Sequence, residues 1–429
     1  MAELIEIDGG VPLRGTIRVG GAKNAALPLL IASLLTGEEC TFRNVPLLED
    51  VSLTFHLLEH FGAECSFSGG VAKVSVPRLV ATEASYSLVK ALRASFWVLA
   101  PLLARGRAAR VALPGGDIIG ARPVDMHIDG LVRMGADISV KHGVVYASAP
   151  HGLKPVEIDF RFPSVGATHQ LIMAAALTPG TSVIRGAAKE PEIVALAELI
   201  NGMGGDVEGA GSSEIIIRGK EELGGADITL IGDRIEAGTY LLAAGITGGE
   251  VRLEGIRPAF FGAFLDVVDQ MGISLTTGEN FVEVRGPARL RPVRVTTGPF
   301  PELATDLQAP LMAALTVADG ESSIDEKVFE GRFGHVSELC RMGAQIRVSG
   351  QSVQITGVER LTGAPVDGLD IRAAACLVVA GLQADGVTQL YEPHHIRRGY
   401  EMLESKLRGV GGRVWARVSD PDDFMFTGC

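Results

Sequence analysis

The sequence has no apolar run long enough to cross a bilayer, few aromatic residues and no clustered cysteines. Its apolar stretches, such as residues 25–35 and 171–177, are shorter than the roughly 18 residues of a membrane-spanning helix, which predicts core helices instead. The start of the chain shows no basic region followed by an apolar run, so no secretory signal is expected. The five cysteines are never spaced as CxxC, which argues against a disulfide framework or a zinc site and favours a reducing cytoplasm.

Excess positive charge is absent as well. A formal net charge of −12 argues against a general nucleic-acid or anionic-membrane binder, but it leaves room for a local cationic pocket. Glycine, in contrast, is abundant, with 54 residues, and the hydrophobic content of 47% is that of a globular protein with many tight turns. A length of 429 residues suggests two domains.

One phrase recurs six times: a helical stretch, a small apolar residue, a glycine and a β-rich run. The glycines of this phrase, spaced by 68 to 73 residues, are Gly62, Gly135, Gly204, Gly272, Gly343 and Gly411. An alanine-rich apolar helix precedes each phrase and ends in glycine, where a left-handed cap is expected. Two markers that keep one period indicate six structural repeats, which fit two domains of three repeats better than an open array.

The alanine-rich helices are apolar nearly all round, which predicts an interior of helices with strands outside. Polar residues collect where these helices start: Lys23 and Asn24, Arg93, Ser164 and Gly166, Asp233 and Glu236, Asp306, and Asp370 with Arg372. Helix N-termini favour anions, so six such ends facing one cleft would attract an anionic ligand. Plain capping explains Ser164, Asp233 and Asp306 equally well. A cation opposes the helix dipole there, which points to a bound phosphate or carboxylate.

Nine segments, in order along nearly the whole chain, together resemble the UDP-N-acetylglucosamine enolpyruvyl transferases. They are GGAKNAALPLL, KALRASFWVLAPL, LPGGDIIGARPVDMHI, SVGAT, EPEIV, DRIEAGTY, TDLQAP, VFEGRFGHV and IRRGYE. The resemblance implies an α/β fold of two inside-out barrel domains, each of three repeats with buried helices and outer strands. It also implies one domain of residues 23–231, and a second of residues 232–429 completed by residues 1–22.

The reaction that this resemblance implies transfers enolpyruvyl from phosphoenolpyruvate to the 3-hydroxyl of UDP-N-acetylglucosamine, the first committed step of peptidoglycan synthesis. It implies neither a metal nor an organic cofactor, because fixed cations and helix ends stabilise the charge. The implied phosphoenolpyruvate contacts are Lys23, Asn24, Arg93, Arg122, Arg372 and Arg398. The implied UDP-N-acetylglucosamine contacts are Asn24, Arg93, Arg122, Pro123, Val124, Asp125, Met126, Ser164, Val165, Gly166, Asp306 and the backbone of Val328.

The same resemblance assigns the catalytic roles. Asp306 would take the proton from the sugar 3-hydroxyl as that oxygen attacks C2, and Lys23 and Arg398 would hold the anionic groups of phosphoenolpyruvate. Glu330 and Asp370 would stabilise the cationic character that builds at C2. Several structural alternatives stay open: an Arg332–Asp370 ion pair at a domain interface, ordinary core positions for Val165 and Met126, and helix-start acids at Glu190 and Glu192.

The main departure from the family pattern is Asp117, which follows LPGG where most members carry the cysteine that donates the proton. An aspartic acid donates only when protonated, and at pH 7 this costs about 4 kcal/mol from a reference pKa near 3.9. Burial beside a phosphate dianion would raise that pKa, whereas nearby arginines would lower it. Some members carry aspartate here, so we expect Asp117 to be the general acid, with an inert replacement as the alternative.

Three smaller departures concern the acceptor. Phe162 stands where many members have a lysine near the nucleotide, Gly331 replaces the asparagine of FENRF, and Leu48 stands at a position that is often basic. They leave open another uridine nucleotide as the acceptor, or a catalytically silent UDP-sugar-binding protein. The sister enzyme that acts on shikimate phosphate lacks the GGAKNAALP start and the long LPGG loop. The sequence indicates no oligomeric state.

Overall fold

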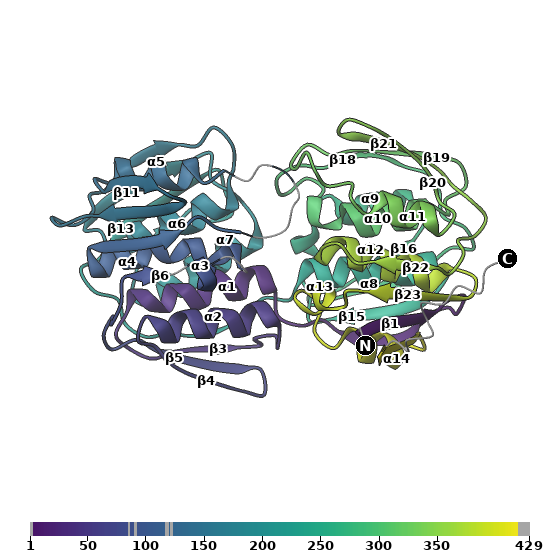
Figure 1. Ribbon diagram of the computed structural model, residues 1–429, viewed down its shortest axis with the longest axis horizontal. Coiled ribbons are helices and arrows are strands. Elements are labelled where there is room, and N and C mark those ends of the chain that lie inside the picture. The colour runs from purple at the N-terminus through teal and green to yellow at the C-terminus, as the bar shows by residue number, and fades with distance from the viewer. Residues whose placement is uncertain (1–2, 85, 90–91, 116–119, 121–122, 419–429) are drawn as a thin grey trace. The chain divides into compact units, whose positions relative to one another are not determined.

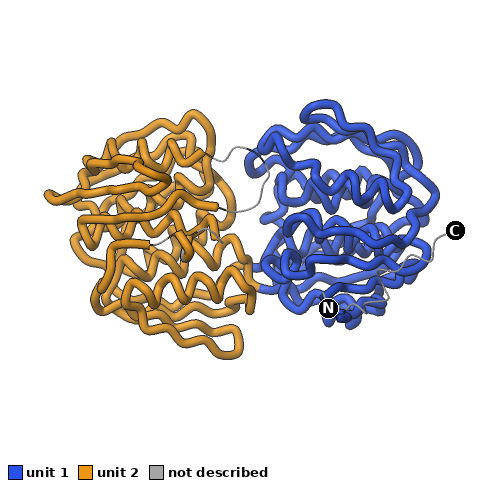
Figure 2. The backbone as a smooth tube through the Cα atoms, viewed as in Figure 1, with its two compact units in different colours: residues 1–20, 118–121, 232–429 blue, residues 21–117, 122–231 orange. Residues whose placement is uncertain are grey.

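The computed structural model describes residues 3–84, 86–89, 92–115, 120 and 123–418. The chain divides into two compact units (Figure 2). Unit 1 comprises residues 1–20, 118–121 and 232–429, and unit 2 comprises residues 21–117 and 122–231. Each unit has a hydrophobic core of its own, and no residue belongs to both cores. The domains of residues 23–231, and of 232–429 with 1–22, stay a prediction.

Unit 2 contains three four-stranded sheets among its described residues. In spatial order they are β14 (Asp227–Thr229), β3 (Cys40–Arg43), β5 (Val71–Ser75), β4 (Glu64–Ser68); β6 (Glu83–Ala84), β7 (Ala108–Ala112), β9 (Val144–Ser148), β8 (Asp137–Lys141); and β10 (Glu157–Asp159), β11 (Gly180–Arg185), β13 (Glu214–Gly219), β12 (Val207–Glu208).

Unit 1 likewise contains three four-stranded sheets in the part of the chain that is described. They are β2 (Arg14–Arg18), β15 (Glu250–Glu254), β17 (Phe281–Arg285), β16 (Ser274–Thr277); β18 (Arg294–Thr296), β19 (Glu321–Asp325), β21 (Ser352–Thr356), β20 (Gln345–Ser349); and β22 (Pro365–Asp367), β23 (Val387–Tyr391), β1 (Glu3–Asp8), β24 (Arg413–Val418).

All six sheets share one pattern of pairing. The first strand in each spatial order runs parallel to the second, and the other neighbours are antiparallel. Three sheets take a strand from far along the chain: β14 pairs with β3, β2 pairs with β15, and β1 lies between β23 and β24. The chain thus leaves unit 1 after β2 and returns to it after β14. Strand β2 completes the sheet that contains β15, and strand β14 completes the sheet that contains β3.

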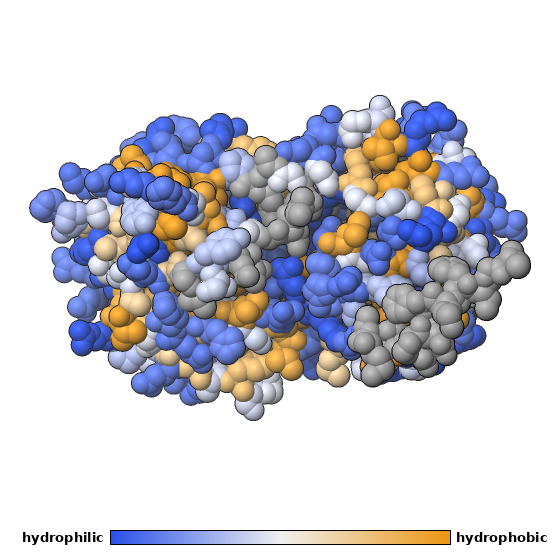
Figure 3. All heavy atoms as spheres, viewed as in Figure 1, coloured by the Kyte–Doolittle hydropathy of each residue, from blue (hydrophilic) through white to orange (hydrophobic). Residues whose placement is uncertain are grey.

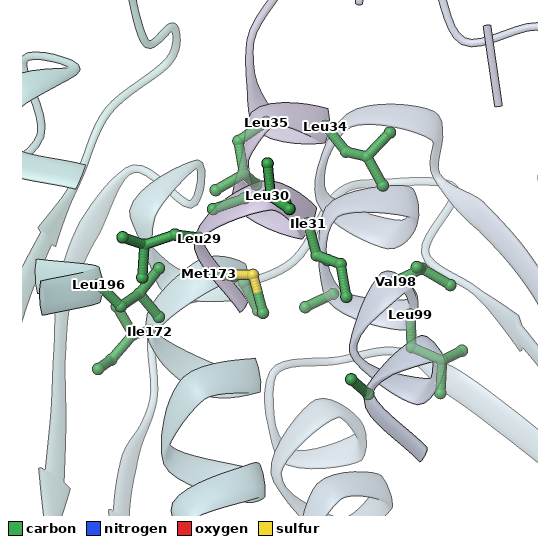
Figure 4. Close-up of a cluster of buried hydrophobic side chains, with 14 of the residues drawn as sticks. Leu29, Leu30, Ile31, Leu34, Leu35, Val98, Leu99, Ile172, Met173 and Leu196 are labelled. Atoms are coloured by element: carbon green, nitrogen blue, oxygen red, sulfur yellow. The ribbon is translucent and has the colours of Figure 1, made fainter. Parts of the chain in front are cut away.

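One helix of each repeat is buried on nearly every side. These inner helices are α1 (Lys23–Ala32), α4 (Leu99–Gly106), α6 (Val165–Ala176), α8 (Arg234–Ile246), α10 (Gln308–Leu315) and α12 (Ile371–Gln383). In unit 2, Leu30 and Ile31 of α1 lie beside Met173 of α6 (Figure 4). Truncating such a side chain, for example Leu30→Ala, is expected to cost about 2–5 kcal/mol of stability. The predicted interior of helices with outer strands is confirmed (Figure 1).

The second helix of each repeat ends in the same way. These helices are α2 (Glu49–His60), α5 (Asp125–Arg133), α7 (Pro191–Gly202), α9 (Phe264–Gln270), α11 (Val336–Arg341) and α14 (Leu403–Gly409). Two residues after each helix comes a glycine of the recurring phrase, with φ between 84° and 100° in all six cases. Other residues rarely adopt this left-handed backbone, so glycine favours the turn from helix to strand at these six positions. The sixfold repeat is confirmed.

The expected glycine caps of the inner helices are only partly present. At the end of α4 the left-handed residue is Arg107, with φ 63°, and not Gly106. After α1 the chain continues through η1 (Ser33–Leu35) into extended Thr36, so Gly37 is not a left-handed cap. Gly180 is the first residue of β11, four residues past α6, and Gly320 lies five residues past α10, so the prediction was wrong at these ends as well. At α8 the cap is as expected, because Gly248, with φ 63°, directly follows the C-cap residue of the helix.

Two inner helices begin with a turn of 3₁₀ helix. These turns are η2 (Arg93–Val98) before α4 and η4 (Thr305–Leu307) before α10. Pro101 and Pro310 lie in the first turns of the α-helices that follow. Because proline has no N–H to donate to the carbonyl four residues earlier, it favours a tighter turn there. The other short helices are α3 (Tyr86–Val89), η3 (Pro258–Phe261) and α13 (His394–Arg397).

Hydrophilic side chains predominate on the face shown in Figure 3, with separate groups of hydrophobic side chains among them. No helix in the described part of the chain is long and apolar enough to span a membrane.

Candidate functional site

In unit 1, the carboxylate of Asp306 lies between two arginines. Arg332 Nη2 donates to Asp306 Oδ1 at 2.6 Å, and Arg372 Nη2 donates to Oδ2 at 3.0 Å. Burial raises the pKa of Asp306, but Arg372 and Arg332 outweigh burial and hold that pKa well below its ordinary value. The structure therefore presents a carboxylate that stays ionised and fixed in orientation at the start of α10.

The ion pair of Arg332 with Asp306 rules out the ion pair with Asp370 that the sequence analysis left open. The ion pair considered from the sequence joined Arg332 to Asp370, but Arg332 bonds Asp306, and its guanidinium lies 5.4 Å from the ring centre of Phe329. Asp370 instead caps α12, where its carboxylate accepts the N–H groups of Arg372 and Ala373. Both aspartates sit at helix starts of one unit, as the sequence predicted.

The buried carboxylate of Glu326 holds the two segments beside Asp306 together. It accepts the hydroxyl of Thr305 at 2.9 Å and the backbone N–H groups of Val328 and Phe329 at 2.8 and 3.1 Å. Since the N–H of Val328 is occupied in this way, any backbone contact of Val328 with a ligand has to use its carbonyl. The sequence analysis missed Glu326, because an acid at the end of a strand gives no local signal.

The start of α12 also contacts the segment that carries Arg398. A Cβ on Gly399 would meet Ile371 Cγ2 at 2.6 Å, so this segment lies directly against the helix start. The next residue, Tyr400, shares a hydrogen bond of 2.8 Å with Thr239 of α8. Within unit 1 the structure thus places the half-buried Arg398 on a chain segment fixed against α12 and α8.

A second buried ion pair in unit 1 holds the start of α8. Lys406 Nζ lies 2.5 Å from Glu236 Oε1, and the other oxygen of Glu236 accepts the N–H of Gly20 at 2.7 Å. Burial raises the pKa of Glu236, although Lys406 lowers it. Asp233 caps α8 through the N–H groups of Ile235 and Glu236. These helix-start acids therefore have structural partners, and Lys406 was not found from the sequence.

In unit 2, Lys23 is buried in an ion pair. Its Nζ lies 3.0 Å from Asp50 Oδ2 in the first turn of α2, and the two side chains are 11% and 2% exposed. Lys23 and half-buried Asn24 are the first two residues of α1. The Asp50 carboxylate thus gives Lys23 an ion-pair partner at the helix start.

The start of α6 gathers the predicted nucleotide contacts of this unit. Ser164 caps the helix by accepting the N–H of Ala167 at 3.2 Å, and Val165 and Gly166 follow it. Trp97 Nε1 donates to the carbonyl of Gly166 at 3.0 Å. His127 of α5 lies beneath Gly166 and donates from Nδ1 to Gln170 Oε1 at 2.6 Å. Trp97, His127 and Gln170 were missed, since the sequence signal was confined to charged and capping residues.

The neighbouring start of α5 carries a surface ion pair. Asp125 pairs with Arg161, next to exposed Phe162, where many members of the resembled family have a lysine. The segment before α6 thus keeps a cation near the start of α5. Val165 and Met126 are half-buried, and Val124 is half-buried next to exposed Pro123. Val165 packs against the hydrophobic core of unit 2, so an ordinary core position stays an alternative for Val165.

The structure describes most of the remaining predicted residues, but not all of them. Asp117 and Arg122 lie outside the described residues. Gly120 is described and lies against exposed Glu330, because a Cβ there would meet the Glu330 carboxyl carbon at 2.7 Å. Half-buried Arg93 opens η2, while Glu190 and Glu192 stand at the start of α7, as predicted. No group of three metal-ligating side chains occurs in the described ranges, and independence from metals stays a prediction.

Comparisons with known proteins extend over nearly the whole chain. The family model of EPSP synthase (3-phosphoshikimate 1-carboxyvinyltransferase) matches residues 7–407. A UDP-N-acetylglucosamine 1-carboxyvinyltransferase of Trichlorobacter lovleyi is 46% identical over 97% of this chain and 99% of its own length. The enzyme of the same name from Rhodopseudomonas palustris is 48% identical over 96% of this chain and 98% of its own length. The crystal structure of the enolpyruvyl transferase NikO from Streptomyces tendae has a TM-score of 0.87 at 25% identity, covering 98% of this chain and 100% of that one. The chain belongs to the EPSP synthase family of enolpyruvyl transferases.

Proposed function

We propose that this chain transfers enolpyruvyl from phosphoenolpyruvate to the 3-hydroxyl of UDP-N-acetylglucosamine and releases phosphate. The observation that carries the proposal is the Asp306 carboxylate, fixed between Arg332 and Arg372 at the start of a buried helix. A carboxylate held in this way suits proton removal from a hydroxyl next to an anionic co-substrate. The curated relatives that bear this activity in their names support the acceptor.

The low pKa of Asp306 fits this role once phosphoenolpyruvate is bound. Arg372 is a predicted contact of that anion, so binding draws its guanidinium partly away from the carboxylate. Because Arg372 is the strongest influence that lowers the Asp306 pKa, losing part of this interaction raises the pKa and makes Asp306 a stronger base. The base is then activated only when the co-substrate is present.

The bond changes balance in two steps. The 3-hydroxyl oxygen adds to C2 as Asp306 takes its proton, and C3 receives a proton from the general acid. Phosphate then leaves C2 and takes the proton held by Asp306, while C3 returns a proton to the general acid, which restores the double bond on the acceptor. The proposed acid is Asp117, and Glu330 and Asp370 carry the negative charge that offsets the cationic character at C2.

The other assignments rest on the family resemblance. Lys23, Asn24, Arg93, Arg122, Arg372 and Arg398 are proposed to contact phosphoenolpyruvate. Asn24, Arg93, Arg122, Pro123, Val124, Asp125, Met126, Ser164, Val165, Gly166, Asp306 and Val328 are proposed to contact UDP-N-acetylglucosamine. Exposed Arg161 beside Asp125 supports a nucleotide at the start of α5, since it supplies a cation that Phe162 lacks. A cytoplasmic location is part of the proposal.

The direct test uses the purified full chain, phosphoenolpyruvate and a panel of acceptors. The acceptors are UDP-N-acetylglucosamine, a second uridine sugar nucleotide and shikimate 3-phosphate, with phosphate release and product mass as the readouts. We expect release with UDP-N-acetylglucosamine and a product heavier by one enolpyruvyl group. If phosphate is released only with another acceptor, that acceptor is the substrate and the proposed one is wrong. Binding of UDP-N-acetylglucosamine with no release would leave a silent binding protein.

A second test isolates the general acid. In the family, fosfomycin alkylates the loop cysteine, because a thiolate attacks an epoxide far better than a carboxylate does. The wild-type chain is therefore expected to resist fosfomycin, and Asp117→Cys to become sensitive. Asp117→Asn keeps the size but has no acidic proton, so it should be nearly inactive. An active asparagine variant would remove Asp117 from the mechanism.

A further inference from the structure

A histidine of α5 packs directly on a glycine at the start of α6. A Cβ on Gly166 would lie 2.8 Å from both Cε1 and Nε2 of His127, closer than side chains normally approach. The His127 ring has little room to move, because Phe96 packs edge-on at 5.5 Å and Nδ1 is hydrogen-bonded to Gln170. Only glycine therefore fits at position 166 while the imidazole keeps its place.

Gly166 is also held from a second element. Trp97 of η2 donates to its carbonyl, and the Trp97 ring in turn packs edge-on against buried His169 at 5.1 Å. Two contacts, one steric and one polar, thus fix the backbone of the first turn of α6 against η2 and α5. The same three elements carry Arg93, Asp125 and Ser164, which are proposed contacts of the acceptor.

We propose that His127 is a positioning residue for the acceptor nucleotide: its ring sets the spacing between the starts of α5 and α6 through contact with Gly166. This inference rests on the proposed function, since it takes the acceptor to bind at these two helix starts. The role needs a rigid, uncharged ring. Burial lowers the pKa of His127 to about 4, although the bond to Gln170 opposes this, so the ring is neutral at pH 7.

A double-mutant cycle tests the contact. Gly166→Ala pushes a methyl group into the ring, His127→Ala removes the ring, and the double variant has room for the methyl group. We expect each single change to weaken UDP-N-acetylglucosamine binding by about tenfold or more, as a displaced contact pair does. In the His127→Ala background, Gly166→Ala should have little further effect. Isothermal titration on the full chain gives the dissociation constants.

A readout of binding against turnover separates positioning from general structural damage. The KM for UDP-N-acetylglucosamine should rise in each single variant. In His127→Ala, the KM for phosphoenolpyruvate and kcat at a saturating acceptor concentration should change little. Gly130→Ala is the matched control: its Cβ would meet Leu171 of α6 at 2.7 Å, the same kind of α5–α6 contact away from the helix starts. It should lower the melting temperature but leave acceptor binding nearly unchanged.

The outcomes distinguish the inference from the proposed function. Additive effects of the two substitutions, or a loss of binding in Gly130→Ala equal to that in Gly166→Ala, overturn the positioning role even when the wild type releases phosphate. The expected binding pattern without phosphate release by the wild type overturns the reaction and leaves the positioning role intact. Failure of the wild type to bind UDP-N-acetylglucosamine overturns both.

Discussion

The starts of the inner helices differ between the two units in the kind of polar group that meets there. At α4 and α6 of unit 2, neutral groups of Trp97, His127 and Gln170 bond one another and the backbone. At α10 and α12 of unit 1, the corresponding places hold ions: Asp306 with Arg332 and Arg372. Repeats of one topology thus carry either a neutral network or a charged one.

The first repeats of the two units reverse the sign of the buried charge. Helix α1 of unit 2 begins with Lys23, paired with Asp50, whereas α8 of unit 1 carries Glu236 in its first turn, paired with Lys406. A neutral network recognises a ligand by shape and hydrogen bonds, whereas fixed ions act where charge changes during a reaction. From this comparison we propose that acceptor recognition relies mainly on unit 2 and charge stabilisation mainly on unit 1.

Removing the charge of Asp306 should give the largest effect. Asp306→Asn keeps the shape but cannot take a proton, so kcat/KM is expected to fall by about a thousandfold, within the usual range of a general base. Phosphate release measures this. Asp385→Asn, the same change in a surface ion pair with Arg360, should leave the rate unchanged. If kcat/KM of Asp306→Asn stays within tenfold of the wild type, Asp306 is not the general base.

Breaking the Lys23–Asp50 pair should have the next largest effect. Lys23→Met leaves the buried Asp50 carboxylate without this ammonium, which is expected to cost about 3–5 kcal/mol of unfolding free energy. Each unit holds one of the two tryptophans, so Trp97 fluorescence in a Trp415→Phe background reports on unit 2 alone. Lys23→Met/Asp50→Leu should recover stability but not turnover, because Lys23 is proposed to contact phosphoenolpyruvate.

The control for this pair is Lys73→Met, the same change in the exposed pair with Glu39. Its effect should stay below about 1 kcal/mol, because solvent screens exposed pairs. Recovery of turnover in the double variant would make Lys23 purely structural and would weaken the contrast between the units.

The neutral histidines of unit 2 predict an acid-sensitive stability. Burial lowers the pKa of His127 and of His169 to about 4, whereas an unfolded histidine titrates near 6.5. Between these values the unfolded chain binds protons that the folded chain rejects. Stability is therefore complete above pH 6.5 and falls as pH drops towards 4, by about 3 kcal/mol for each histidine.

Urea unfolding at pH 7, 6, 5 and 4, followed by Trp97, measures this slope. His127→Gln keeps a donor for Gln170 but does not titrate, so the loss of stability with acid should become smaller. His56→Gln changes an exposed histidine of α2 in the same way and should leave the slope as it is. An unchanged slope in His127→Gln would mean that this ring is not buried in neutral form.

The repeats and helix starts were predictable because they follow from local rules. Glycine at a left-handed position and small polar residues at helix starts leave a periodic pattern in the sequence. The partners of these residues were not predictable in the same way. Arg372 is 66 residues from Asp306, and Lys406 is 170 residues from Glu236, so their pairing depends on how whole repeats pack. The sequence analysis therefore named Asp306, Arg332 and Arg372 but did not pair either arginine with Asp306.

Glu326 offers the smallest but most discriminating test of whether charge itself orders unit 1. Glu326→Ala removes the carboxylate that accepts the N–H groups of half-buried Val328 and Phe329, at a cost of about 1–3 kcal/mol. Glu326→Gln keeps the bonds, because its oxygen accepts both N–H groups and its NH₂ donates to Thr305 after that hydroxyl rotates. Amide hydrogen exchange of residues 320–335, read by mass spectrometry, should be faster in the alanine variant and near wild type in the glutamine variant. If glutamine is as damaging as alanine, the negative charge of Glu326 orders this segment. Near-wild-type exchange in the glutamine variant instead shows that hydrogen bonds suffice in this segment, as in unit 2, and that its order needs no charge at position 326.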